Sequence, residues 1–312
     1  MRARSLKCVY QLAKQEPRVV FVGSDLGVGT LKEFKAEMPE RFFMEGIAEA
    51  HLIGMSAGLA KEGYIPYVNT IATFLTRRCY EQIAIDVCLP NLPVRLIANG
   101  GGLVYAPLGP THLAIEDIAL MRLLPNMTIL VPSDAEEMER LMQQTLDWPG
   151  PIYIRVAKGG EPLVSDPNKE CKIGKAILLR EPGEVLIVTM GYMVHRALET
   201  AIHLQKEGIQ CGVLNMHTIK PLDKEAIFSY ADRVKYLVVL EEHHKSGGLG
   251  SAVIEAFVDT GRPLSNLMHF ALPDQFSEHY GSQDQLLDHY ALSIANICKH
   301  IKKQLGMRDE CK

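Results

Sequence analysis

Short apolar runs alternate with helix-like segments along this 312-residue chain, and this alternation restricts the folds that are open to it. Helical patterns, among them residues 73–87 and 135–146, separate the runs of the first half. Runs of about five apolar residues between helices are typical of strands buried on both faces of a parallel sheet. The pattern predicts an α/β domain of βαβ units that ends near residue 160. Its strand-like runs are residues 19–23, 64–70, 94–98, 127–131 and 152–155.

A second alternation follows a change in composition. Residues 161–172 contain two prolines together with Ser, Asp and Asn, which is typical of a linker. With 47% hydrophobic and 22% charged residues, the chain can bury two cores. We therefore expect two consecutive α/β domains with mostly parallel sheets, residues 1–160 and 173–312. The second alternation comprises residues 185–189, 193–207, 211–215, 236–240, 250–258 and a final helix near 283–305.

Charge and cysteine content exclude several classes of function. The formal net charge of −4 gives no indication of nucleic-acid binding. The sequence contains no run of about 18 apolar residues, so it predicts no membrane span. The apolar stretch at residues 8–13 is too short for a signal sequence. The seven cysteines are scattered and show no paired metal-ligand spacing. These features predict a cytoplasmic protein whose thiols serve as small apolar residues.

Residues 41–60 form the most informative segment for function, because an apolar, small-residue helix there carries Glu49 and His51 near its start. A carboxylate partly removed from water suits a hydrogen bond to a weakly basic ring nitrogen better than a surface salt bridge. Glu49 and His51 lie on different faces of a helix and are not spaced as metal ligands. Without further context, Glu49 is more often a capping or ion-pairing residue.

Several linked motifs give Glu49 such a context. In order and spacing they resemble the pyrimidine-binding domain of the transketolase family of thiamine diphosphate enzymes, which includes 1-deoxyxylulose-5-phosphate synthase. The segments 218–223 and 241–250 are similar to the transketolase C-terminal domain. The motifs of the first domain are residues 41–49, 67–75, Arg77, Tyr80, Asp86, Gly109-Pro110-Thr111-His112, 124–127 and 131–134.

The resemblance implies roles for four of these residues. Glu49 would bind the ring nitrogen of the cofactor's aminopyrimidine and promote the tautomer that activates thiamine diphosphate. Phe74 would stack on that ring, and Tyr80 would complete the pocket. His112 would face the substrate carbonyl from a rigid Gly-Pro turn, which leads into a helix expected to begin near Ala114. Outside this family, Phe74 is more often a core residue and His112 a surface-loop residue.

Three features have two open interpretations each. Arg77 contacts the cofactor or a substrate anion, or it pairs with Glu81 one turn further on. Arg155 ends a strand at the edge where α/β folds bind ligands, and the resemblance places a donor-phosphate arginine there; a structural ion pair is the alternative. The glycine-rich turn at residues 247–250 either holds an anion or is a tight strand-to-helix turn, and the turn is favoured.

The chain also departs from the family pattern. Leu108 stands where many transketolases have an Asp before Gly-Pro-Thr-His, and Asn99-Gly100 stands where relatives carry a further sugar-binding His. Sugar specificity therefore cannot be transferred from the resemblance.

A Gly-Asp-Gly motif, through which relatives bind the cofactor diphosphate and Mg²⁺, is missing from the sequence. We therefore expect the C-terminal subunit of a split transketolase, active with a separate diphosphate-binding subunit in an α2β2 assembly. It would transfer a two-carbon ketol unit from a ketose phosphate to an aldose. The alternatives are the β subunit of a 2-oxoacid dehydrogenase, a deoxyxylulose-phosphate-synthase-like enzyme, and a non-catalytic scaffold or regulatory paralogue.

Overall fold

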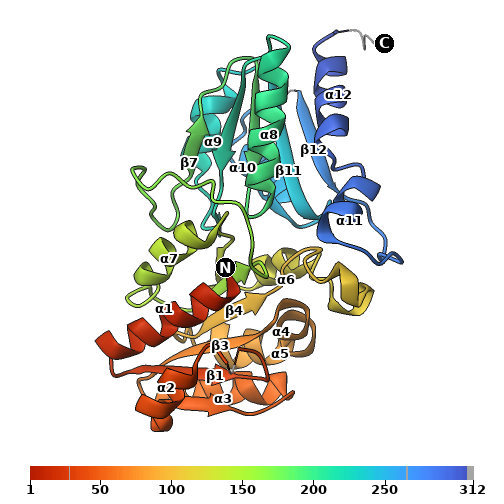
Figure 1. The fold of residues 1–312 in the computed structure, drawn as a ribbon. Coiled ribbons are helices and arrows are strands. Elements are labelled where there is room, and N and C mark those ends of the chain that lie inside the picture. The colour runs from red at the N-terminus through yellow and green to blue at the C-terminus, as the bar shows by residue number, and fades with distance from the viewer. Residues whose placement is uncertain (28, 265, 308–312) are drawn as a thin grey trace.

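Two sheets covered by helices follow one another in the computed structural model, which describes residues 1–27, 29–264 and 266–307 (Figure 1). Both sheets are mostly parallel, as the alternation of apolar runs and helices predicts. The predicted fold class of two consecutive α/β domains is therefore confirmed.

The first sheet has seven strands in the order β10-β5-β6-β4-β3-β1-β2. Strands β1 to β6 run parallel to one another. Strands β1, β4 and β6 are buried along their whole length, which explains why they are largely apolar runs in the sequence. The bounds are β1 (Val19–Gly23), β2 (Phe42–Met44), β3 (Ile65–Ile71), β4 (Arg95–Asn99), β5 (Thr128–Leu130) and β6 (Ile152–Val156).

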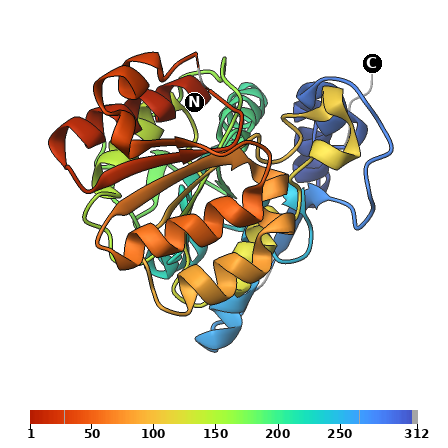
Figure 2. The same ribbon diagram turned by 90° about the horizontal axis from the view of Figure 1, so that it is seen from below.

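Helices cover both faces of this sheet, and Figure 2 shows the sheet between the red helices α1 and α2 and the orange helices α3 and α4. On one face, α1, α2 and α7 contribute to an apolar cluster, and α3, α4 and α6 contribute to a cluster on the other. The bounds are α1 (Arg2–Gln15), α2 (Lys32–Glu37), the 3-10 turn η1 (Pro39–Arg41), α3 (Glu49–Lys61), α4 (Ala72–Arg78), α6 (Asp117–Leu123) and α7 (Ala135–Gln144).

The second sheet has five strands in the order β12-β11-β8-β9-β7, of which only β7 is antiparallel to its neighbour. Within the described residues, no helix is long and apolar enough to cross a membrane. The bounds are β7 (Ile177–Arg180), β8 (Val185–Thr189), α8 (Met193–Lys206), β9 (Cys211–Asn215), α9 (Lys224–Ala231), β11 (Tyr236–His244), α10 (Leu249–Asp259), β12 (Leu267–Leu272), α11 (Gln283–His289) and α12 (Ile294–Gln304).

Strand β10 (Thr218–Lys220) joins the two domains. It follows β9 of the second sheet in sequence, yet it pairs antiparallel with β5 at the edge of the first sheet. One apolar cluster is also continuous across the junction and includes Ile129 from the first domain and Leu214 from the second. A large apolar junction of this kind fixes the orientation of two domains.

Two of the predicted helices are interrupted. The helix expected over residues 73–87 leaves helical geometry at Cys79 (φ −114°, ψ 11°), and the short helix α5 (Tyr80–Gln82) then leads into a π-helical segment, η2 (Ile83–Cys88). The single final helix is wrong because Ala291 has a positive φ of 60°, which ends α11 before α12 begins.

The helix expected near Ala114 begins at Asp117 instead. Its backbone is engaged elsewhere, because Ala114 and Gly102 form an isolated bridge in which Gly102 N donates to Ala114 O at 2.7 Å. Between them the chain makes two short 3-10 turns, η3 (Ala106–Leu108) and η4 (Pro110–His112). The loop that carries His112 is therefore pinned at both ends.

Candidate active site

Glu49 is the first residue of α3, and its side chain is only 3% exposed. The preceding Gly46 has a φ of 74°, a conformation that favours glycine and turns the chain into the helix. A carboxylate in the first helical turn is stabilised by the free N–H groups and the positive end of the helix dipole. The sequence therefore places a buried carboxylate at the start of α3.

The partner of Glu49 is Arg78, at the end of α4. Arg78 Nη1 donates to Glu49 Oε2 at 2.9 Å, and the Arg78 side chain is 48% exposed. Its guanidinium carbon also lies 3.8 Å from the centroid of the Phe74 ring. A planar cation thus lies on an aromatic face while it pairs with a buried carboxylate.

His112 contacts the same aromatic ring from η4. The Phe74 and His112 rings meet edge to face, with 5.1 Å between centroids and 66° between planes. His112 Nδ1 lies 2.9 Å from Thr111 Oγ1, which orients the imidazole. Continuous contacts therefore connect Glu49, Arg78, Phe74 and His112, and the structure brings three of the predicted residues together from three separate segments.

Arg77 lies next to these residues, and its ion-pair partner is Glu116. Its Nε donates to Glu116 Oε1, and its Nη2 donates to Leu113 O at 3.2 Å, so the expected pairing with Glu81 is wrong. Arg77 and Glu116 line a cavity of about 680 Å³ that lies between the two domains. Its other lining residues are His244, Ser246, Asp274, Gln275 and Phe276.

Tyr80 is half-buried and packs against the apolar cluster beneath α3 and α4. Among the described residues, no ring contact joins Tyr80 to Phe74 or His112. Tyr80 therefore packs on the apolar core near the site and does not contact the Phe74 ring.

Arg155 forms a structural ion pair, which is one of the two interpretations that the sequence allows. Its Nε donates to Asp117 Oδ2 at 2.8 Å, and its Nη2 contacts Asp117 Oδ1 at 3.2 Å. Nη2 also donates to Ala114 O and Glu242 O, and the residue is 6% exposed. Burial lowers the pKa of Arg155, but Asp117, Glu242 and Tyr153 together outweigh it and the pKa is raised. These contacts connect the strand end to the His112 loop and to the second domain.

A carboxylate of the chain itself caps the glycine-rich turn at residues 247–250. Glu241 accepts hydrogen bonds from Leu249 N at 2.7 Å and Gly250 N at 2.9 Å, and His269 Nε2 lies 2.7 Å from it. A Cβ on Gly248 would lie 2.1 Å from Glu241 Oε2. The turn is therefore a strand-to-helix turn, and the anion on its N–H groups is Glu241.

Two family models match this chain in succession. The model "Transketolase, pyrimidine binding domain" matches residues 1–160, and "Transketolase, C-terminal domain" matches residues 174–297. The chain belongs to the transketolase family. This family and the related 1-deoxy-D-xylulose-5-phosphate synthases depend on thiamine diphosphate.

Three curated relatives illustrate how much of the family architecture this chain spans. A transketolase family protein, y4mN, from Sinorhizobium fredii is 39% identical, with 94% of this chain and 86% of that protein covered. One of the subunits of apulose-4-phosphate transketolase from Phocaeicola vulgatus is 35% identical, with 93% and 92% covered. The chain spans about half of the synthases it matches: that of Synechococcus sp. is 37% identical over 96% of this chain but only 46% of its own length.

Solved structures give the same picture. A split-gene transketolase, described as an inactive β4 tetramer, has a TM-score of 0.87 and 36% identity, with 98% of both chains covered. Transketolase from Campylobacter jejuni shares the fold with a TM-score of 0.77 at 20% identity, over 96% of this chain and 46% of that one.

Arg78 is the residue at this site that the sequence reasoning missed. A local signal was available, because Phe74 and Arg78 are four residues apart and share a face of α4. No comparable signal indicates its pairing with Glu49, which lies 29 residues earlier.

Proposed function

We propose that this chain is one subunit of a split transketolase-type enzyme and that it supplies the pyrimidine-binding half of a thiamine diphosphate site. The observation that carries the proposal is the set of contacts from Glu49 through Arg78 and Phe74 to His112. Two relatives that match this chain over nearly their whole length are described as a transketolase subunit and as a split-gene transketolase.

The residues present fit the aminopyrimidine of the cofactor. Glu49 and the Phe74 face together hold the guanidinium of Arg78, which is planar and carries N–H donors. A protonated aminopyrimidine shares both properties, so the same carboxylate and aromatic face can bind it. Arg78 must leave this position when the ring is bound, and its half-exposed side chain has room to do so.

When bound, thiamine diphosphate supplies the carbon nucleophile that attacks the substrate carbonyl. The residues of this chain control protons and geometry around it. Glu49 holds a proton at the pyrimidine ring nitrogen, and Phe74 fixes the tilt of that ring and excludes water. His112, oriented by Thr111, exchanges a proton with the substrate oxygen through Nε2. Arg155 would act as a positioning residue that holds the carbonyl of Ala114 at the end of the His112 loop.

The partner in this proposal is a separate subunit that binds the cofactor diphosphate and Mg²⁺, and the working assembly is α2β2. The substrates are a ketose phosphate donor of a two-carbon ketol unit and an aldose acceptor. A second candidate is a deoxyxylulose-phosphate-synthase-like reaction, because relatives with that name are 37–38% identical over 89–96% of this chain. An activity assay with pyruvate as the donor in place of the ketose phosphate distinguishes the two reactions.

The test is calorimetric titration of thiamine diphosphate with Mg²⁺ into this chain, first by itself and then mixed with a candidate diphosphate-binding subunit. We expect binding only in the mixture. Glu49→Gln should lose ketol transfer by at least about 100-fold, because the proton at the ring nitrogen is no longer shared with a carboxylate. Glu62→Gln is the matched control, since Glu62 is exposed at the other end of α3.

Tight binding by the isolated chain would contradict the need for a partner. Full ketol transfer by Glu49→Gln would contradict the role of Glu49. Absence of binding to a mixture in which the two subunits associate would favour the scaffold alternative.

A further inference from the structure

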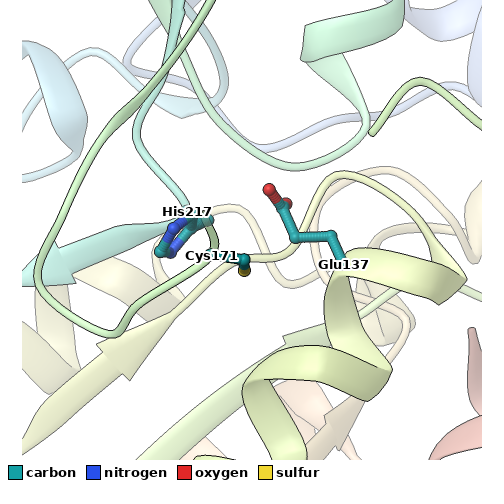
Figure 3. Close-up of side chains that lie close together, drawn as sticks. All are labelled: Glu137, Cys171 and His217. Atoms are coloured by element: carbon teal, nitrogen blue, oxygen red, sulfur yellow. The ribbon is translucent and has the colours of Figure 1, made fainter. Parts of the chain in front are cut away.

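Three potential metal ligands meet where the two domains and the linker join. A ligand atom from each of Glu137, Cys171 and His217 lies within 4.8 Å of the other two. Figure 3 shows the three side chains close together on separate segments. Glu137 belongs to α7 of the first domain, Cys171 to the linker, and His217 to the segment between β9 and β10. None of them contributes to the candidate active site.

His217 has an unused ring nitrogen in this cluster. The residue is fully buried, and its Nδ1 lies 2.9 Å from Thr218 Oγ1, which orients the ring. Among the described residues, its Nε2 has no hydrogen-bond partner. Buried polar atoms are rarely left unpaired, and such an atom calls for water or an ion.

Two further unpaired atoms belong to residues that contact Glu137. Ser133 N donates to one Glu137 oxygen at 2.6 Å, and Asn215 Nδ2 donates to the other at 2.7 Å. Within the described part of the chain, Ser133 Oγ and Asn215 Oδ1 are themselves buried without a partner. Three unsatisfied polar atoms around one small cluster point to a bound species, because each costs free energy if it remains unpaired.

The surrounding contacts fix the cluster in place. Gln144, on the same helix as Glu137, accepts from Ile173 N at 3.1 Å and donates to Cys171 O at 2.8 Å, so it holds the linker on both sides of Lys172. Arg140 Nη1 donates to the carbonyls of Asp166 and Lys169 at 3.3 and 3.0 Å. Metal sites require ligands held by such supporting hydrogen bonds.

We propose that Glu137, Cys171 and His217 bind a divalent cation, with Zn²⁺ as the best match to their chemistry. Thiolate, imidazole and carboxylate ligands together select a borderline-soft ion and disfavour Mg²⁺ and Ca²⁺. A tetrahedral zinc site places its ligand atoms about 3.3–3.7 Å apart, so no pair of these atoms has to approach by more than about 1.5 Å on binding. Cys171 is partly exposed, which provides an entry path and a place for water as the fourth ligand.

The charges near the cluster are compatible with a cation. Asp134 and Arg140 lie close enough to interact electrostatically with Cys171, with opposite signs. Burial raises the pKa of Glu137 and so disfavours its charge until a cation binds. Cys171 adds a further negative charge when its thiol proton passes to solvent on metal binding. The bound ion would connect the first domain, the linker and the second domain, so its role is to stabilise the junction and not to take part in the reaction.

Co²⁺ is the probe for the first experiment, because thiolate-bound Co²⁺ absorbs in the near ultraviolet and tetrahedral Co²⁺ absorbs strongly in the visible. The full chain carries Cys311→Ser as background, since Cys311 lies outside the described residues and its thiol could compete. We expect one equivalent of Co²⁺ to give both bands. Cys171→Ser should lose the near-ultraviolet band, and Cys298→Ser, which removes a buried thiol elsewhere, should retain it.

Thermal unfolding with Zn²⁺ gives a second, independent readout. A hundredfold excess of free Zn²⁺ over its dissociation constant should raise the Tm of the chain by about 5 °C. Glu137→Gln has nearly the same shape but loses the charge and can keep only one of the two hydrogen bonds that the carboxylate accepts. It should therefore lose most of this rise even if Cys171→Ser fails to fold. The absence of both Co²⁺ bands, a near-ultraviolet band that survives Cys171→Ser, or an equal Tm rise in Glu137→Gln would each overturn the site.

Discussion

Two arginine–carboxylate pairs adjoin the loop that carries His112, and they differ in the surroundings of the arginine. Asp117 is fully buried and Arg155 is 6% exposed, and Arg155 also donates to two backbone carbonyls. Glu49 is nearly as buried as Asp117, but its partner Arg78 is 48% exposed and makes one hydrogen bond and one ring contact. The two carboxylates are similarly buried, so the pairs differ mainly in how exposed the arginine is.

The comparison separates a structural pair, Arg155–Asp117, from an exchangeable pair, Arg78–Glu49. Removing a partner from a buried pair leaves an uncompensated charge, whereas a half-exposed arginine can give up its place to water or a ligand at little cost. Asp117 also accepts a hydrogen bond from Tyr153 Oη at 2.7 Å, which further fixes the structural pair. The comparison therefore supports the proposal that Glu49, and not Asp117, binds the cofactor.

The largest effect is expected for Arg155→Met. This change leaves Asp117 charged and buried without its partner, which should lower the free energy of unfolding by about 3–5 kcal/mol. Urea unfolding of the full chain measures the loss. The double variant Asp117→Asn with Arg155→Met should recover part of it, and Arg18→Met, in a surface pair with Glu16, should cause no comparable loss. A small loss for Arg155→Met would place Arg155 among the exchangeable arginines and support phosphate binding instead.

An intermediate effect is expected where a buried carboxylate is paired with backbone N–H groups. In Gly248→Ala the new methyl group would meet Glu241 Oε2 at 2.1 Å, so the carboxylate must shift away from Leu249 N and Gly250 N. We expect destabilisation of about 1–3 kcal/mol in thermal unfolding. Gly58→Ala, in an open position of α3, should be neutral or slightly stabilising. Equal Tm values for the two variants would show that the cap tolerates displacement.

A smaller effect, on binding and not on stability, is expected for Arg78→Met. Its pairing with Glu49 contributes at most about 1 kcal/mol to stability, because the arginine is half-exposed. Without the competing guanidinium, the assembled enzyme should bind thiamine diphosphate about two- to tenfold more tightly by calorimetry. Arg233→Met, which removes an arginine 5.6 Å from the Tyr230 ring centroid, is the matched control. Weaker binding would mean that Arg78 contacts the cofactor directly.

The sequence predicts the repeating elements of the fold well, because each buried strand is itself a short apolar run. It does not predict β10, whose three residues join the first sheet by antiparallel pairing with β5, nearly ninety residues earlier. Nor does it predict the break at Cys79 or the bridge between Gly102 and Ala114, since both depend on tertiary contacts. Local pattern reveals what an element buries but not which distant segment it pairs with.

The same limit applies to the sites. Glu49, Phe74 and His112 were predicted because linked motifs carry them, whereas the two interpretations of Arg155 could not be separated without Asp117, which lies 38 residues away. The proposed metal ligands are about 35 and 45 residues apart and have no local spacing, so the cysteine pattern gave no sign of them. A site whose residues come from two domains and a linker can be recognised only once the fold is known.

The smallest effect concerns Glu242, the buried carboxylate beside the structural pair. Burial raises the pKa of Glu242, while Arg155 opposes this shift. The native state therefore binds this proton more tightly than the unfolded state. The resulting stability is complete below the ordinary Glu pKa of about 4.3 and is lost as the pH rises through the raised value.

Glu242→Gln removes this titration, because the amide cannot ionise but can still accept the hydrogen bond from Leu103 N. As the pH rises above the ordinary Glu pKa, the free energy of unfolding of this variant should fall less steeply than that of the wild type. The residual slope is due partly to Glu137, whose pKa burial also raises. An unchanged slope in urea unfolding across this range would mean that Glu242 is ionised beside Arg155, which would extend the structural pair to a buried triad.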